Sequence, residues 1–181
     1  MDDQQLVEKV IDGDKQAFSQ LIKKYQRLVA SVVFKLINDQ RDREELVQDI
    51  FVKIYQKIGE FRFNSKLSTW IATISYREAI SVLRKKKKVI EDDFENVNFG
   101  QNTDHFGNQD RSEFIKGVID TLPHNYAVIL TLYHIEGFNY SEIVEIMEMP
   151  EGTVKNYLFR ARKKLKDLLI PYLEKEQLLY E

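Results

Sequence analysis

Apolar residues recur at three- and four-residue steps over much of the chain, the spacing of one face of an α-helix. The clearest case lies between residues 15 and 36, where the pattern predicts one long helix with a single apolar stripe. Asp14 stands just before it and predicts the N-cap. The stripe consists of Phe18, Leu21, Ile22, Tyr25, Leu28, Val29, Val32 and Leu36.

Two more helices are predicted in the first half of the chain. One opens at Asp42, with Glu45 at the spacing of a capping box, and carries apolar residues as far as Ile58. The next begins near Ser68 and runs to the cluster Lys85–Lys88. Its apolar residues spread around most of the circumference. This favours a helix that is packed on several sides or has an apolar surface with another use.

The last third of the chain predicts shorter helices, broken at Pro123 and Gly137. Asn139, with an acid three residues later, is a good N-cap for one of them. A turn at Pro150–Gly152 then precedes a final helix that opens at Thr153. Almost no segment has the two-residue alternation of a strand. We therefore expect an all-α fold in two parts.

A break in composition separates the two parts. Residues 89–112 contain four Asn, two Gly and no regular apolar period, which is typical of a linker. We expect a helical bundle over residues 1–88, an acidic linker over 89–112 and a helix-turn-helix domain over 113–181.

Charge is distributed unevenly along the chain, although the net charge is only −2. Residues 1–88 hold 18 basic and 12 acidic residues, the linker holds one Arg and six acids, and residues 113–181 hold 8 basic and 11 acidic residues. The near-neutral total argues against binding of nucleic acid. The basic first part reopens that possibility.

Several classes of protein find no support in the sequence. The absence of cysteine excludes disulfides and thiol chemistry, and the three histidines lack the spacing of metal ligands. No glycine-rich phosphate loop or nucleophilic serine motif is present. We expect no catalytic residue, no metal and no cofactor. The densest apolar stretch, Leu28–Phe34, is interrupted by Ser31 and is too short to cross a membrane, and the acidic start does not resemble a signal peptide. We expect a cytoplasmic protein without membrane insertion.

Residues 139–169 have the pattern of a helix-turn-helix motif, with basic and polar residues facing outward on the second helix. Such a helix fits the major groove, where its early residues reach base edges and later cations meet phosphates. The same spacing also fits an ordinary helical corner with a solvated face. The outward residues are Lys155, Asn156, Arg160, Arg162, Lys163 and Lys166.

Two other groups of residues are ambiguous by themselves. In residues 61–88, aromatic rings alternate with cations, which suits single-stranded nucleic acid but also a packed core with a basic helix end. The aromatic residues are Phe61, Phe63, Trp70 and Tyr76, and the cations include Arg62, Lys66, Arg77, Arg84 and Lys85. The polar face around Glu44–Phe51 is either a protein-docking surface or simply a solvated face.

Four motifs in the same order resemble those of bacterial sigma factors. Gln16-Ala17-Phe18 with Tyr25, Glu45-Leu-Val-Gln48-Asp49-Ile-Phe51 and Ser68-Thr-Trp70-Ile are similar to their N-terminal core domain. The run from Leu122-Pro123 through Gly152-Thr-Val-Lys155 to Leu165 is similar to their C-terminal promoter-reading domain. Two domains without a middle one point to the extracytoplasmic-function group. An independent helix-turn-helix regulator and a protein-binding helical adaptor are the rival classes.

The resemblance implies a non-enzymatic subunit that directs core RNA polymerase to promoter DNA and is controlled by an anti-sigma factor. It implies that the linker threads the nucleic-acid path of the polymerase. The polymerase-binding residues would be Glu45, Gln48, Asp49 and Phe51. Those for the minus-ten element would be Ser65, Lys66, Ser68, Trp70, Tyr76, Arg77, Ser81, Arg84 and Lys85. Those for the minus-thirty-five element would be Thr153, Lys155, Asn156, Arg160, Arg162 and Lys163.

Some positions depart from the pattern of that family. Tyr76 and Ser81 stand where Asn and Asp are common, and Met147-Glu148 replaces a usual Leu-Gly. Asn156 stands where Ser is common. These changes leave the expected fold intact and bear on which bases are read.

Overall fold

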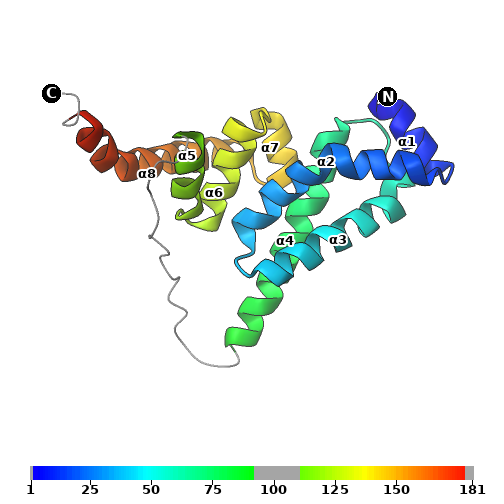
Figure 1. Cartoon of the computed structure of the whole chain (residues 1–181), viewed down its shortest axis with the longest axis horizontal. Coiled ribbons are helices and arrows are strands. Elements are labelled where there is room, and N and C mark those ends of the chain that lie inside the picture. The colour runs from blue at the N-terminus through cyan, green and yellow to red at the C-terminus, as the bar shows by residue number, and fades with distance from the viewer. Residues whose placement is uncertain (1, 92–110, 178–181) are drawn as a thin grey trace.

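The computed structural model describes residues 2–91 and 111–177, and every regular element in these ranges is a helix (Figure 1). The first range holds α1 (Asp3–Ile11), α2 (Lys15–Leu36), α3 (Gln40–Lys57), the single turn η1 (Ile58–Glu60) and α4 (Leu67–Glu91). The second holds α5 (Arg111–Asp120), α6 (His124–Leu130), the turn η2 (Thr131–Ile135), α7 (Tyr140–Met147) and α8 (Glu151–Gln177). The all-α prediction is confirmed. The ends of the predicted linker are helical, and residues 92–110 lie outside the described ranges.

Helix α2 is the centre of the first half, and α1, α3 and α4 pack against it. Its start is fixed by Asp14, whose Oδ1 accepts from the backbone N–H of Gln16 at 2.8 Å and of Ala17 at 3.1 Å. The predicted stripe is largely buried, with Leu21 and Val29 fully inside. The sequence-based prediction of this helix and its cap is confirmed.

Two features of the first half differ from the prediction. Helix α3 begins at Gln40, because Asp39 caps it by accepting from the backbone N–H of Asp42 at 3.0 Å. Asp42 is therefore inside the helix and is not its cap. Helix α1 was not predicted at all. It is only nine residues long, and the apolar residues that it buries are Leu6, Val7 and Val10.

In the second half, α6 packs between α8 and the neighbouring short elements. Asn139 and Glu142 form the predicted capping box, with reciprocal bonds of 2.8 and 3.0 Å. The turn of the helix-turn-helix lies at residues 148–150, earlier than predicted. Helix α8 therefore starts at Glu151, before Thr153, and the carbonyl of Pro150 accepts from the N–H of Thr153 at 2.8 Å.

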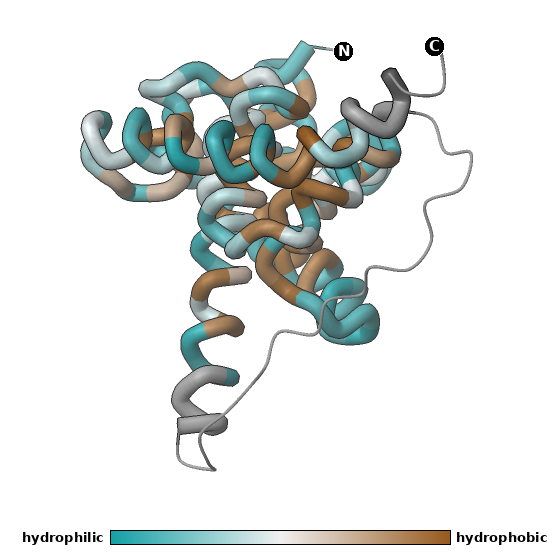
Figure 2. Tube along the Cα trace, turned by 90° about the vertical axis from the view of Figure 1, so that its left-hand side faces the viewer, coloured by the Kyte–Doolittle hydropathy of each residue, from teal (hydrophilic) through white to brown (hydrophobic). Residues whose placement is uncertain are grey.

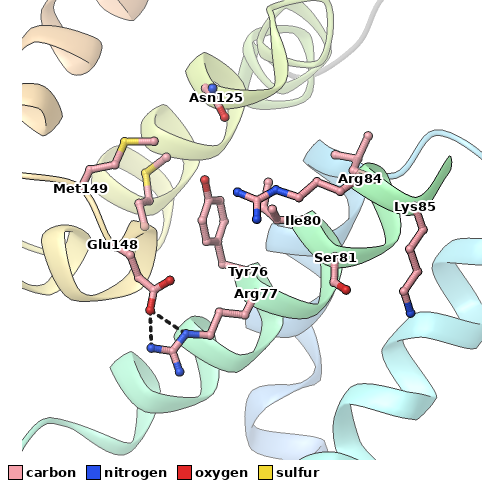
Figure 3. A pocket seen from close by; sticks show the side chains of 11 residues that line it. Tyr76, Arg77, Ile80, Ser81, Arg84, Lys85, Asn125, Glu148 and Met149 are labelled. Atoms are coloured by element: carbon pink, nitrogen blue, oxygen red, sulfur yellow. Dashed lines mark hydrogen bonds and ion pairs between the residues drawn. The ribbon is translucent and has the colours of Figure 1, made fainter. Parts of the chain in front are cut away.

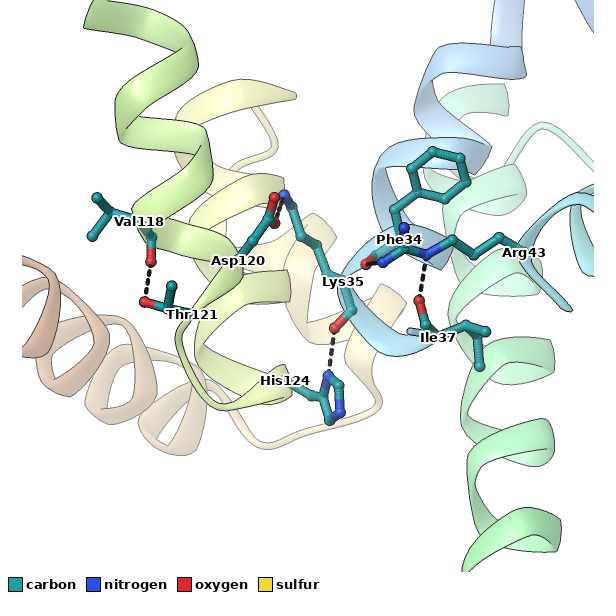
Figure 4. A network of polar contacts seen from close by, with 8 residues as sticks. All are labelled: Phe34, Lys35, Ile37, Arg43, Val118, Asp120, Thr121 and His124. Atoms are coloured by element: carbon teal, nitrogen blue, oxygen red, sulfur yellow. Dashed lines mark hydrogen bonds and ion pairs between the residues drawn. The ribbon is translucent and has the colours of Figure 1, made fainter. Parts of the chain in front are cut away.

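The two halves pack against each other, an arrangement that the sequence left open. Helix α7 lies on α4, and α6 with η2 lies on α2, so one continuous apolar core spans both halves. Hydrophobic segments gather where the helices cross, and hydrophilic ones face outward (Figure 2). At the edge of this contact, Lys35 forms an ion pair with Asp120, and the Lys35 carbonyl accepts from Nδ1 of His124 at 2.6 Å (Figure 4).

Candidate functional site

The first candidate surface is a shallow apolar groove between α2 and α3. Its lining residues are Gln26, Arg27, Ala30, Phe34, Glu44, Val47 and Gln48. Phe34 is 43% exposed, and the Arg43 guanidinium lies over its ring at 4.9 Å. Arg43 is itself anchored, because its Nε donates to the Ile37 carbonyl at 2.5 Å (Figure 4). The groove thus presents a fixed apolar floor with a polar rim.

The predicted docking residues lie differently around this groove. Gln48 lines it, and Glu45 and Asp49 are exposed on the same helix. Phe51 is buried and packs in the core beneath the surface, because it faces the interior of the bundle. Further along α3, Val52 and Tyr55 are exposed large side chains that the sequence analysis missed as surface residues. Tyr55 belongs to the apolar pattern that runs to Ile58, but it is 46% exposed.

The second candidate surface is α4 with the loop before it. The rings of Phe61, Phe63 and Trp70 cluster there, with Phe61 4.7 Å from Phe63 and 5.4 Å from Trp70 between ring centroids. Phe61 is buried, whereas Phe63 is half exposed and has a left-handed backbone with φ of +58°. Of the aromatic residues, Phe61 belongs to the core and Phe63 is free to meet a partner.

Three predicted minus-ten residues are engaged by acidic side chains of the second half. Lys66 pairs with Glu142 at 2.8 Å, and the Ser65 hydroxyl donates to Glu145 at 3.0 Å. Nε of Arg77 donates to Glu148 at 2.9 Å, and its Nη2 binds the same oxygen (Figure 3). Helix α7 and the residue that caps it therefore cover this part of α4.

The pKa of Glu142 reflects this engagement. Burial acts to raise the pKa of its carboxyl, but the Lys66 ammonium and the backbone N–H of Asn139 outweigh burial and hold it below its usual value. Glu142 is thus a firmly ionised acceptor with one oxygen for the cap and one for Lys66.

A cavity of about 700 Å³ lies beside these contacts, between α4 and the second half (Figure 3). It is lined by Tyr76, Arg77, Ile80, Ser81, Leu83, Arg84, Lys85, Asn125, Met147, Glu148 and Met149. Tyr76 is only 7% exposed, and burial raises the pKa of its hydroxyl. Ser81 is half-buried, and Arg84 and Lys85 are exposed. Ser68 and Trp70, which are also among the predicted minus-ten residues, are half-buried at the start of α4 and do not line the cavity.

The third candidate surface is the outward face of α8. Lys155, Asn156, Arg160 and Lys163 are exposed and share one side of the helix by their spacing, and Thr153 is half-buried at its start. Phe159 lies among them and is 67% exposed, although the sequence analysis did not single it out. An aromatic residue in a helical apolar pattern is normally assigned to the core. The position of Phe159 one turn after Lys155 was the signal that it faces outward.

Arg162 follows Lys155 by about two turns and is also exposed, but its side chain is engaged by η2. Its guanidinium lies 4.9 Å over the Tyr133 ring, and its Nε donates to Nε2 of His134 at 3.1 Å. Burial, followed by the nearby Arg162 charge, lowers the pKa of His134, so that the ring is neutral and can accept. Arg162 is therefore held against η2.

Within residues 2–91 and 111–177, no group of three or more acidic or histidine side chains is arranged to hold a metal ion. In the same ranges, no helix is sufficiently long and apolar to cross a membrane. The arrangement offers polar and cationic surfaces for binding. The fold and these surfaces define a two-part helical protein with a helix-turn-helix and a separate basic helix.

Comparison with known proteins assigns this class to a family. Residues 21–89 match the family described as Sigma-70 region 2, and residues 115–165 match Sigma-70, region 4. The chain is 33% identical to the ECF RNA polymerase sigma-E factor of Haemophilus influenzae, over 94% of this chain and 97% of that protein. It is 30% identical to the RNA polymerase sigma-H factor of Pseudomonas aeruginosa, over 94% and 95% of the two chains.

A solved structure agrees with this assignment. The sigma factor RpoE of Bartonella quintana, crystallised with the anti-sigma factor NepR, matches with a TM-score of 0.66 and 26% identity over 84% of this chain and 96% of that one. The chain belongs to the sigma-70 family, in its extracytoplasmic-function group. It is a non-enzymatic sigma factor that directs RNA polymerase to promoters.

Proposed function

We propose that this sigma factor uses its three candidate surfaces for three separate partners. The groove between α2 and α3, around Gln48, docks on core RNA polymerase. Helix α4 and the loop before it bind and open the minus-ten element. The outward face of α8 reads the minus-thirty-five element in the major groove. Domain limits of 1–88 and 113–181, with the linker between them, are part of this proposal.

One observation carries the assignment of α4. Arg77 of α4, together with Ser65 and Lys66 of the loop before it, already binds three carboxylates, those of Glu142, Glu145 and Glu148. A surface that accepts a row of negative charges is suited to a nucleic-acid backbone. The neighbouring rings of Phe63 and Trp70 supply faces on which unpaired bases can stack.

The polymerase assignment rests on the groove beside Gln48. It is apolar, its floor is fixed by Arg43, and it remains open while α4 is covered. Exposed apolar area of this kind is typical of a protein-binding surface. We also propose a cytoplasmic location, where polymerase and promoter DNA meet, and control by an anti-sigma factor. The complex of the Bartonella relative with NepR supports the latter.

Run-off transcription tests the function as a whole. Core polymerase with this protein should initiate at defined sites on a genomic template library, and core polymerase alone should not. A regulator that acts without polymerase docking would bind promoter DNA but leave initiation by the core unchanged. A protein-binding adaptor would do neither. Failure to redirect initiation would therefore overturn the proposal.

A further inference from the structure

Glu148 occupies a backbone conformation that side chains rarely adopt. It caps α7 with φ of +53° and ψ of +41°, in the left-handed region. Glycine reaches this region freely, whereas a residue with a Cβ atom is strained there. A strained residue persists where its surroundings hold it in place. The contact of the Glu148 side chain is therefore informative.

That contact crosses between the two halves of the chain. Glu148 accepts from Nε of Arg77, 71 residues earlier, at 2.9 Å, and Nη2 of Arg77 binds the same oxygen. The pair closes one side of the cavity beside Tyr76, as Figure 3 shows. Met147, next to Glu148, is buried in the core that the two halves share.

Glu148 is also the last of three acids at intervals of three residues. Glu142 binds Lys66, Glu145 binds Ser65, and Glu148 binds Arg77. All three partners belong to the surface that we assign to the minus-ten element. Successive carboxylates on one side of a short helix present a row of negative charges, as the phosphates of a nucleic-acid strand do.

We propose that the acidic row Glu142–Glu145–Glu148 is an internal substitute for the promoter strand, and that Glu148 is the lock that holds it on α4. This inference rests on the proposed role of α4 in binding DNA. In the free protein the row occupies the groups that a DNA strand needs. The strand binds only after α7 leaves, so its apparent affinity falls with the fraction of molecules that are open.

The exposure of these pairs indicates how strong the lock is. The side chains of Arg77 and Glu148 are 56% and 54% exposed, and exposed ion pairs are individually weak. The buried contacts of Tyr76 and Met147 therefore supply most of the attraction between the halves. The acidic row shifts the equilibrium between closed and open molecules and makes it depend on ionic strength.

The test uses the full chain, which has no native cysteine, so dyes can be placed on Lys23→Cys and Asp167→Cys. Single-molecule energy transfer measures the open fraction, and anisotropy of labelled oligothymidine measures strand binding. Glu148→Gln should raise the open fraction and the strand affinity about two- to fivefold. Glu148→Gly should do the same without loss of thermal stability, because glycine relieves the left-handed strain.

Two further variants complete the test. Glu60→Gln removes one negative charge near Lys57, on η1, which packs against α1 and α3, and it controls for a general change in net charge. The exchange Arg77→Glu with Glu148→Arg should restore closure to near the wild-type fraction. An unchanged open fraction in both Glu148 variants, or an exchange that stays open, would overturn the lock. A larger open fraction with unaltered strand affinity would instead overturn the assignment of α4 to DNA.

Discussion

Lys35 binds His124 of the second half through its backbone carbonyl, and it binds Asp120 of the same half through its side chain. Nδ1 of His124 lies 2.6 Å from the Lys35 carbonyl oxygen, and because that oxygen can only accept, the imidazole donates. The ammonium of Lys35 meanwhile pairs with Asp120. The Lys35 side chain is only 10% exposed, so the ion pair is partly shielded from solvent.

This relationship predicts the behaviour of a cleaved chain. The sequence between Val89 and Ser112 lacks an apolar period, and we expect a protease to cut there first. The two fragments should still elute together in size-exclusion chromatography, because they share one core. Lys35→Ala should weaken their association roughly fivefold, about 1 kcal/mol, and the exposed Lys23→Ala should not. Separate elution of the wild-type fragments would show that the linker alone holds the halves together.

A second prediction concerns polymerase docking. Gln48→Ala with Asp49→Ala should weaken binding to core polymerase at least ~10-fold, since residues central to an interface cost over 1 kcal/mol when truncated. Helix content by circular dichroism should not change, because both side chains are exposed. Gln4→Ala with Asp12→Ala, on exposed positions of and after α1, is the matched control. Unaltered core affinity in the first variant would remove this face from the interface.

A third prediction separates base reading from phosphate binding on α8. Asn156→Ala should change base preference at the upstream element, with ~1–3 kcal/mol per well-made contact. Arg160→Ala should weaken binding to all sequences alike and reduce the salt slope by about one. Binding to a randomised promoter library at several salt concentrations measures both effects. The reverse pattern would mean that the two roles have been exchanged.

A fourth prediction concerns strand opening by Tyr76. If its ring stacks on an unpaired base when α7 has left, Tyr76→Ala should lower open-complex formation by ~1–3 kcal/mol but spare closed-complex binding. Tyr76→Phe keeps the ring and should behave as wild type. Permanganate reactivity of unpaired thymines reports opening, and a pre-melted template should rescue the alanine variant. Equal opening by both variants on paired DNA would leave Tyr76 as a core residue only.

A fifth prediction follows from the lowered pKa of His134. Because the folded protein favours the neutral ring, the unfolded chain binds the proton more readily, and stability rises with pH through this range. The contribution is complete above about pH 6.5, the usual value, and is lost as the pH falls below it. His134→Asn should flatten the melting temperature between about pH 5 and 7. An equally steep profile in the variant would place the titration elsewhere.

Local patterns predicted what local contacts determine. The stripe of α2 with its Asp14 cap and the Asn139–Glu142 capping box depend on residues three or four apart, and all are present. Helix α1 escaped prediction because it is only nine residues long and buries only three apolar residues. The turn at Glu148 was noticed as a departure, but its partner Arg77 lies 71 residues away and could not be inferred.

The predicted site residues illustrate the same limit. Gln48 and Asp49 are exposed as expected, whereas Phe51 in the same motif is buried. The motif alone does not specify which of its residues packs in the core and which contacts a partner. Tyr76 is covered by the second half, and no helical period in α4 could show that. Phe159 was overlooked because an aromatic residue in a helix is normally assigned to the core, although its position one turn after Lys155 places it on the outward face.

The groove between α2 and α3 stays uncovered while α7 lies on α4, and this asymmetry sets a sequence of events. Under the proposed assignments, the free protein can bind polymerase before it can bind a melted strand. A free molecule still presents the outward face of α8 to duplex DNA, but it cannot hold an opened strand on α4 until α7 leaves. The contact between α7 and α4 therefore sets the order of binding, with polymerase first and the opened strand second.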